Sequence, residues 1–162
     1  MRSHVPTMAS ADNPKEVAAL TLTADDRIAI EELMARYNVA FDSCDVQAWV
    51  ETFLPDGVFD GIYGVTVGAE ALGEFLRWHW RDPKLAAHRG SQHWVTNVVI
   101  EGTETEARVQ CYGTVLSGGR SDNRVMGVWQ YHDEVRKVDG KWRYAKRYVR
   151  AFEPAAEGTD NT

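Results

Sequence analysis

The stretch "GSQHWVTNVVI", Gly90–Ile100, marks the point at which this 162-residue chain changes from helical to strand patterning. Before it, apolar residues recur at helical spacing. After it, β-branched and aromatic residues fill four long segments, 92–101, 106–116, 124–137 and 142–152. The short polar and glycine-rich sequences between these segments are typical of hairpin turns. Helices followed by a strand meander indicate an α+β fold.

Three helices are expected before this point. The first has Thr23 as its N-cap and an apolar stripe that reaches Cys44. A short second helix is capped by Asp45 and closed by "PDG" at 55–57, and 58–68 predicts two short strands. The third spans 68–82 and turns four residues inward, namely Leu72, Phe75, Leu76 and His79. We therefore predict a cone: a curved, mostly antiparallel sheet of five or six strands wrapped on the long first helix.

Residues 21–153 are expected to form one domain between an N-terminal arm, 1–20, and a tail, 154–162. The net charge of -6 is spread without basic blocks, which argues against a nucleic-acid partner. No apolar run approaches the ~20 residues of a membrane span, and the N-terminus lacks the apolar centre of a secretory signal. Cys44 and Cys111 form neither a disulfide framework nor a metal quartet. We expect a cytoplasmic protein without metal or cofactor.

Two polar residues do not fit the patterns around them. His93 opens a strand whose two faces both look covered by apolar residues. Asp42 lies at the C-terminal end of the first helix, where the helix dipole disfavours a carboxylate. Ser43 and Asp45 are better placed to cap the next helix, so Asp42 lacks a structural role. His93 is interpreted either as a structural histidine whose ring nitrogens have hydrogen-bond partners or as a catalytic histidine.

Tyr37 and Arg147 are the other two candidates. Tyr37 lies within the apolar stripe, where a core aromatic residue is the simpler interpretation. Strand alternation groups Arg147 with small apolar neighbours, so its charge requires a carboxylate or an anionic ligand. The same alternation places Tyr144 with Arg150 on the opposite face, which is expected to be solvated or interfacial.

The chain resembles the SnoaL-like branch of the NTF2-like superfamily of cone-shaped α+β proteins. The resemblance covers roughly residues 22–152 and rests on "RYNVAFDSCDVQAWVETFLPDGVF", "SQHWVTNVVIEG" and "VDGKWRYAKRYVRAF". Within the superfamily, the pattern is similar to that of bile-acid 7α-dehydratase, scytalone dehydratase and hexachlorocyclohexane dehydrochlorinase. The first of these carries a further catalytic aspartate in the next strand, and the second carries a histidine there. This chain offers only Val115 or a neighbour at that place.

The resemblance implies catalytic roles for Tyr37, Asp42, His93 and Arg147. Asp42 would hold one nitrogen of His93, and His93 would act as general base. Tyr37 would donate a hydrogen bond to the leaving oxygen or to a carbonyl group, and Arg147 would stabilise developing negative charge or orient Asp42. The expected activity is a cofactor-independent, dehydratase-like lyase acting on a hydrophobic alicyclic or polycyclic substrate. An isomerase or cyclase using the same base, or a binding module without chemistry, is the alternative. Six residues are predicted to line the substrate-binding cavity: Trp49, Phe59, Tyr63, Trp80, Val95 and Cys111.

The resemblance also implies a homo-oligomer, with a trimer favoured over a dimer. Aromatic residues are frequent in the last two strands and would suit an interface on the outer face of the sheet. These residues are Trp129, Tyr131, Trp142, Tyr144 and Tyr148.

Overall fold

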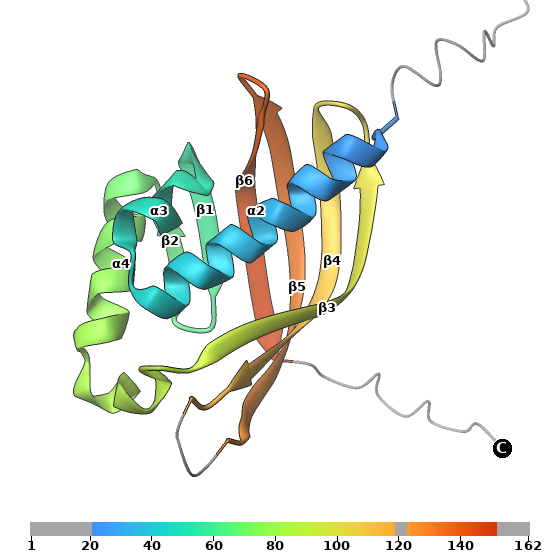
Figure 1. Cartoon of the computed structure of the whole chain (residues 1–162). Coiled ribbons are helices and arrows are strands. Elements are labelled where there is room, and N and C mark those ends of the chain that lie inside the picture. The colour runs from blue at the N-terminus through green and yellow to red at the C-terminus, as the bar shows by residue number, and fades with distance from the viewer. Residues whose placement is uncertain (1–20, 119–122, 152–162) are drawn as a thin grey trace, which may run out of the picture.

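The computed structural model describes residues 21–118 and 123–151. It confirms an α+β fold in which one open, curved six-stranded sheet packs against an N-terminal helix (Figure 1). The expected arm 1–20 and tail 154–162 lie outside the described residues. In the part of the chain described, no helix combines the length and apolar character needed to cross a membrane.

The helices fall close to the expected places. Helix α2 is Ala24–Ser43, α3 is Val46–Glu51 and α4 is Ala69–Arg81, followed by a short 3₁₀ helix, η1, at Pro83–His88. Thr23 and Asp26 form a capping box at the start of α2. Cys44 ends α2 in the left-handed conformation (φ 57°), and the Asp45 side chain accepts from the Ala48 amide to begin α3.

The strands follow the order β2-β1-β6-β5-β4-β3 across the sheet. β1 and β6 pair in parallel and all the other neighbours pair antiparallel. Figure 1 shows α2 lying across the concave side, with α3 and α4 near β1 and β2. The bounds are β1 Phe53–Gly61, β2 Gly64–Val67, β3 Gln92–Gly102, β4 Glu106–Leu116, β5 Val125–Val138 and β6 Lys141–Ala151.

The segment "PDG" at 55–57 does not close a helix as the sequence suggested. It lies inside β1, where the register with β6 shifts between Phe53 and Val58. Gly57 makes this possible, because a Cβ there would lie 2.9 Å from the Leu54 carbonyl oxygen and from the Phe53 Cβ. The irregularity lets β1 start immediately after α3.

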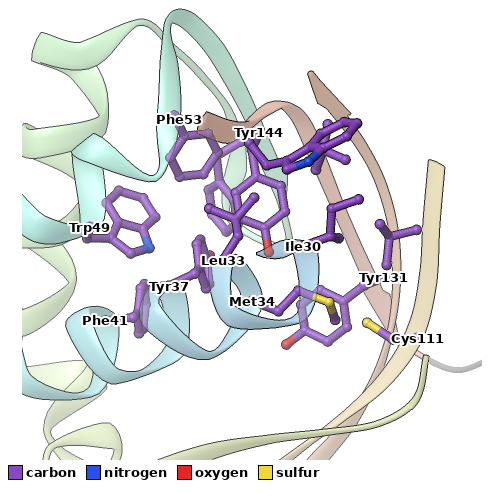
Figure 2. Packing of buried hydrophobic residues seen from close by; sticks show 14 of the residues in the cluster. Ile30, Leu33, Met34, Tyr37, Phe41, Trp49, Phe53, Cys111, Tyr131 and Tyr144 are labelled. Atoms are coloured by element: carbon purple, nitrogen blue, oxygen red, sulfur yellow. The ribbon is translucent and has the colours of Figure 1, made fainter. Parts of the chain in front are cut away.

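The core fills the space between α2 and the concave face of the sheet (Figure 2). Ile30, Leu33, Met34, Tyr37 and Phe41 supply its helical side at the expected spacing. From the sheet, Tyr131, Trp142 and Tyr144 point inward and are almost fully buried. These three rings therefore do not lie on the outer face, and the interface argument from the last two strands loses most of its aromatic residues.

Candidate functional site

Asp42 and His93 meet at the C-terminal end of α2 and the start of β3. Asp42 Oδ1 lies 2.5 Å from His93 Nδ1, and the His93 backbone amide donates to Asp42 Oδ2 at 2.9 Å. Both side chains are only 18% exposed. Because a carboxylate only accepts hydrogen bonds, this contact keeps the proton of the neutral ring on Nδ1 and leaves Nε2 as its basic nitrogen.

The end of α2 is held where Asp42 can reach β3. The Trp80 indole of α4 donates to the Phe41 carbonyl oxygen at 3.1 Å, and the Cys44 amide donates to the same oxygen at 3.1 Å. At the other side of the pair, Ser91 bonds back to the His88 carbonyl oxygen before β3 begins. Phe41 packs edge-on against the His93 ring, with centroids 5.2 Å apart.

His93 borders a cavity that we name the aromatic pocket. It has a volume of about 70 Å³ and lies at the end of the sheet near the β1–β2 turn and η1. Its lining residues are Tyr37, Phe41, Phe59, Ile62, Tyr63, Phe75, His79, His88, His93, Val115, Trp129, Tyr131 and Val149.

His93 also borders a second hollow, the open groove between α2 and β3, which has a volume of about 790 Å³. Asp42, Asn38 and Val95 line this groove but not the aromatic pocket. The Asp42–His93 pair therefore separates an apolar cavity from a hollow that is open to solvent. Such a position suits a proton acceptor, because the proton can leave on the solvent side.

Of the predicted site residues, Tyr37, Phe59 and Tyr63 line the aromatic pocket together with His93. Tyr37 is 4% exposed, and burial raises the pKa of its hydroxyl, while the Arg147 charge opposes this shift. The hydroxyl therefore stays protonated and can donate a hydrogen bond at any ordinary pH.

The other predicted residues lie outside the pocket. Trp49 and Cys111 are core residues, and Trp80 holds the end of α2. Arg147 is fully buried behind the pocket, with its guanidinium carbon 4.1 Å from the centre of the Tyr37 ring and 4.3 Å from that of Tyr131.

The partner of Arg147 is Asp133, which the sequence reasoning missed. Arg147 Nη1 lies 3.7 Å from Asp133 Oδ2, and it donates a hydrogen bond to the Tyr144 hydroxyl. Burial raises the pKa of Asp133 to about 6, and the Arg147 charge opposes this rise. Arg150, by contrast, bonds to Asp60 at 2.7 Å on the other side of the strand.

Two further histidines were not predicted as site residues. His79 of α4 was expected to face inward, and the structure places it and His88 in the wall of the aromatic pocket. The sequence signal for His79 was its position as a polar residue within the apolar stripe of α4. Among residues 21–118 and 123–151, no group of three His, Cys, Asp or Glu side chains is arranged to hold a metal ion.

Comparison with known proteins agrees with this architecture. A family model described as the SnoaL-like domain matches residues 22–148. The chain belongs to this family. A cystatin-like protein of unknown function from Nostoc punctiforme is 33% identical and superimposes with a TM-score of 0.73, covering 83% of this chain and 96% of its own.

Two structures from Novosphingobium aromaticivorans are also similar to this SnoaL-like protein. One, an NTF2-like protein with a cystatin-like fold, is 22% identical with a TM-score of 0.71 over 82% of this chain and 85% of its own. The other, described as a candidate scytalone dehydratase, is 25% identical with a TM-score of 0.66 over 80% of this chain and 85% of its own.

Proposed function

We propose that this SnoaL-like protein is a lyase of the dehydratase type, which needs no cofactor and uses His93 as general base. The observation that carries the proposal is the 2.5 Å contact between Asp42 and His93 at the wall of the aromatic pocket. Asp42 orients the ring and stabilises the imidazolium that forms when Nε2 takes a proton. The structural similarity to a candidate scytalone dehydratase supports the same reaction class.

The size of the aromatic pocket limits what can bind beside His93 on its apolar side. Because one water needs roughly 10–15 Å³ of such space, 70 Å³ holds about five to seven, which suits a single six-membered ring. A polycyclic substrate would place one ring inside and leave the rest at the mouth. Ile62 and Tyr63 line that mouth and are 48% and 45% exposed.

Tyr37 is the proposed hydrogen-bond donor to the leaving oxygen or to a carbonyl group. It lines the pocket, and its hydroxyl remains protonated through burial. Arg147 does not line the pocket, so we assign it a positioning role: its charge lies against the Tyr37 ring and holds that side chain in place. This assignment replaces the two roles expected of Arg147, stabilising a developing negative charge or orienting Asp42, because the carboxylate beside it is that of Asp133.

The test is a screen of ring-bearing β-hydroxy ketones, followed through the absorbance of the conjugated enone formed on loss of water. His93→Gln is expected to abolish turnover, and Asp42→Asn to lower it about 10²–10⁴-fold. His132→Gln is the matched control, because His132 is exposed on β5.

An activity that survives His93→Gln would contradict the proposal. A shifted double bond or a closed ring that depends on His93, without loss of water, would instead indicate an isomerase or a cyclase. Tight ligand binding without any turnover across the screen would indicate a binding module.

A further inference from the structure

Three histidines line the aromatic pocket, and the proposed proton abstraction uses one of them. His79 comes from α4 and His88 from η1, with ring centroids 5.6 Å apart. His79 and His93 both pack against Phe41, at centroid distances of 5.0 and 5.2 Å. Two imidazoles therefore flank the same aromatic ring in the wall of one small cavity.

His79 has an unmet hydrogen-bonding group. His79 is 7% exposed, and its buried Nδ1 atom has no hydrogen-bond partner. Leaving such a buried group without a partner destabilises the folded state. The other inward-facing positions of α4 are apolar, as at Leu72 and Leu76. An apolar residue would fill this place without that cost, so packing alone does not explain a histidine here.

The state of the ring limits what it can bind. Burial, together with the nearby His88 and His93, lowers the pKa of His79 to about 4. At neutral pH the ring is uncharged and offers one N–H and one lone pair. It can donate to a carbonyl oxygen or accept from a hydroxyl group. It cannot offset the cost of burying a carboxylate or a phosphate.

We propose that His79 is a substrate-binding residue, which hydrogen-bonds a ketone or hydroxyl oxygen on the ring that occupies the aromatic pocket. The inference rests on the proposed function and names its substrate class: a neutral, oxygenated ring held between His79 and His93. Because Nδ1 of His79 has almost no accessible surface, the ring bonds such an oxygen atom through Nε2, and Nδ1 stays buried. This hydrogen bond also fixes which carbon of the substrate ring faces His93.

The test uses the full chain and two probes that differ by one hydroxyl group, 4-fluorophenol and fluorobenzene, titrated by ¹⁹F NMR. The wild type is expected to bind the phenol more tightly than fluorobenzene. His79→Phe keeps an aromatic ring but removes both nitrogens, and should weaken phenol binding about threefold to tenfold, as expected for one hydrogen bond. Fluorobenzene binding should change little. His132→Phe, on the exposed side of β5, should bind both probes as the wild type does.

A second measurement needs no variant at this position. In the ¹⁵N-labelled wild type, 4-fluorophenol should shift the His79 ring nitrogens and fluorobenzene should not. Equal affinities of a folded His79→Phe variant and the wild type for the phenol, or unmoved His79 nitrogens, would overturn the inference. If the phenol shifts His93 but not His79, the pocket remains a ligand site and only the role of His79 fails. If neither probe binds at millimolar concentration, the pocket is no ligand site and the proposed function fails as well.

Discussion

Asp133 and Arg147 face each other across β5 and β6, and both side chains are fully buried. Their separation of 3.7 Å allows an ion pair, but Nε and Nη2 of Arg147 have no hydrogen-bond partner. Three tyrosine rings surround the guanidinium, those of Tyr37, Tyr131 and Tyr144, at 4.1 to 4.9 Å. The pair thus lies in an apolar, aromatic setting, where ionising Asp133 is costly.

This cost predicts an unusual dependence of stability on pH. The pKa of Asp133 is raised to about 6, so the folded state binds a proton more tightly than the unfolded state, whose carboxyl group titrates near 4. The contribution of this group to the free energy of unfolding is fully present below about pH 4 and is lost as pH rises through about 6. The loss amounts to roughly 3 kcal/mol. Urea unfolding at several pH values between 4 and 7 measures it.

Asp133→Asn isolates this contribution, because the amide does not titrate. The difference in unfolding free energy between the wild type and this variant should fall by most of this amount between pH 4 and 7. Asp139→Asn is the control: Asp139 is exposed, and asparagine tolerates its positive φ of 51°. A constant difference between wild type and Asp133→Asn across this range would show that Asp133 does not titrate there.

Strand alternation placed Arg147 on an otherwise apolar face and predicted a carboxylate or an anionic ligand as its partner. The structure places the carboxylate of Asp133 there. This partner was open to the same reasoning, because alternation in β5 places Tyr131, Asp133 and Val135 on one buried face. Pairing Asp133 with Arg147 requires the register of two strands, which residue patterns do not contain. Asp42 and His93 are 51 positions apart, so residue patterns alone do not pair them. The prediction that they meet rested on the family resemblance.

At the scale of the secondary-structure elements, Asp26 joins the start of α2 to the last two strands. Its carboxylate accepts from the Thr23 amide and hydroxyl, from Lys137 Nζ at 2.7 Å and from Trp142 Nε1 at 3.0 Å. These bonds hold the pKa of Asp26 well below its usual value, and the one from Lys137 has the largest effect. One side chain therefore both caps the helix and fixes its start on the sheet.

Asp26→Asn is expected to lower the free energy of unfolding by about 2 kcal/mol at pH 7, because bonds to a charged group are replaced by weaker ones. A depressed pKa stabilises the fold above the unfolded value near 4 and loses this effect as pH falls below it. Wild type and variant should therefore converge in acid, in thermal or urea unfolding. Asp25→Asn, on the exposed neighbour, should change stability by less than about 0.5 kcal/mol. A gap that persists undiminished at pH 2 would contradict the electrostatic explanation.

Two bulges explain where simple alternation failed. In β3, Asn97 and Val98 together oppose Cys111, and Asn97 has a φ of 56°. His93 and Val95 face inward before the bulge and Val98 and Ile100 after it, while Trp94 and Val99 are exposed. The sequence suggested that both faces of this strand are covered. The structure shows that one of them is exposed.

The second bulge lies in β6, where Ala145 is the extra residue opposite the step from Glu134 to Val135. It brings Tyr144 to the same buried side as Arg147, although the alternation rule assigns them to opposite faces. Periodicity gave the extent of these strands, because burial selects β-branched and aromatic residues. An inserted residue leaves no such signature, and it reverses every assignment beyond it.

At the scale of the whole molecule, the curvature of the sheet determines where chemistry is possible. The sheet is open, and β3 forms one of its edges (Figure 1). His93 at the start of β3 bonds to Asp42 at the end of α2. The core fills the space between α2 and the concave face, and the aromatic pocket lies beyond it, at the end lined by α4, η1 and the β1–β2 turn. A base placed at that end reaches both an apolar cavity and solvent.

The outer face near this end exposes apolar residues that a second copy of the chain could cover. Trp94, Thr114 and Val128 align across β3, β4 and β5, and Trp94 and Val128 are 57% and 49% exposed. Tyr112, 40% exposed, lies on the same face one pair further along. Apolar side chains gathered in this way favour an interface between subunits. They replace the buried rings of β5 and β6 in the argument for an oligomer.

We therefore expect a homo-oligomer, with a trimer favoured over a dimer, assembled through this outer face. Sedimentation velocity at micromolar concentration should show one species larger than the 18.2 kDa chain. Trp94→Glu should shift it toward the monomer, because association would bury an unpaired carboxylate. Val138→Glu is the matched control, since Val138 is 41% exposed but lies at the opposite end of β5. The Asp42–His93 pair bonds within one subunit, so the Trp94→Glu monomer should retain the activity that depends on His93. A wild-type chain that sediments as a monomer at this concentration would refute the assembly.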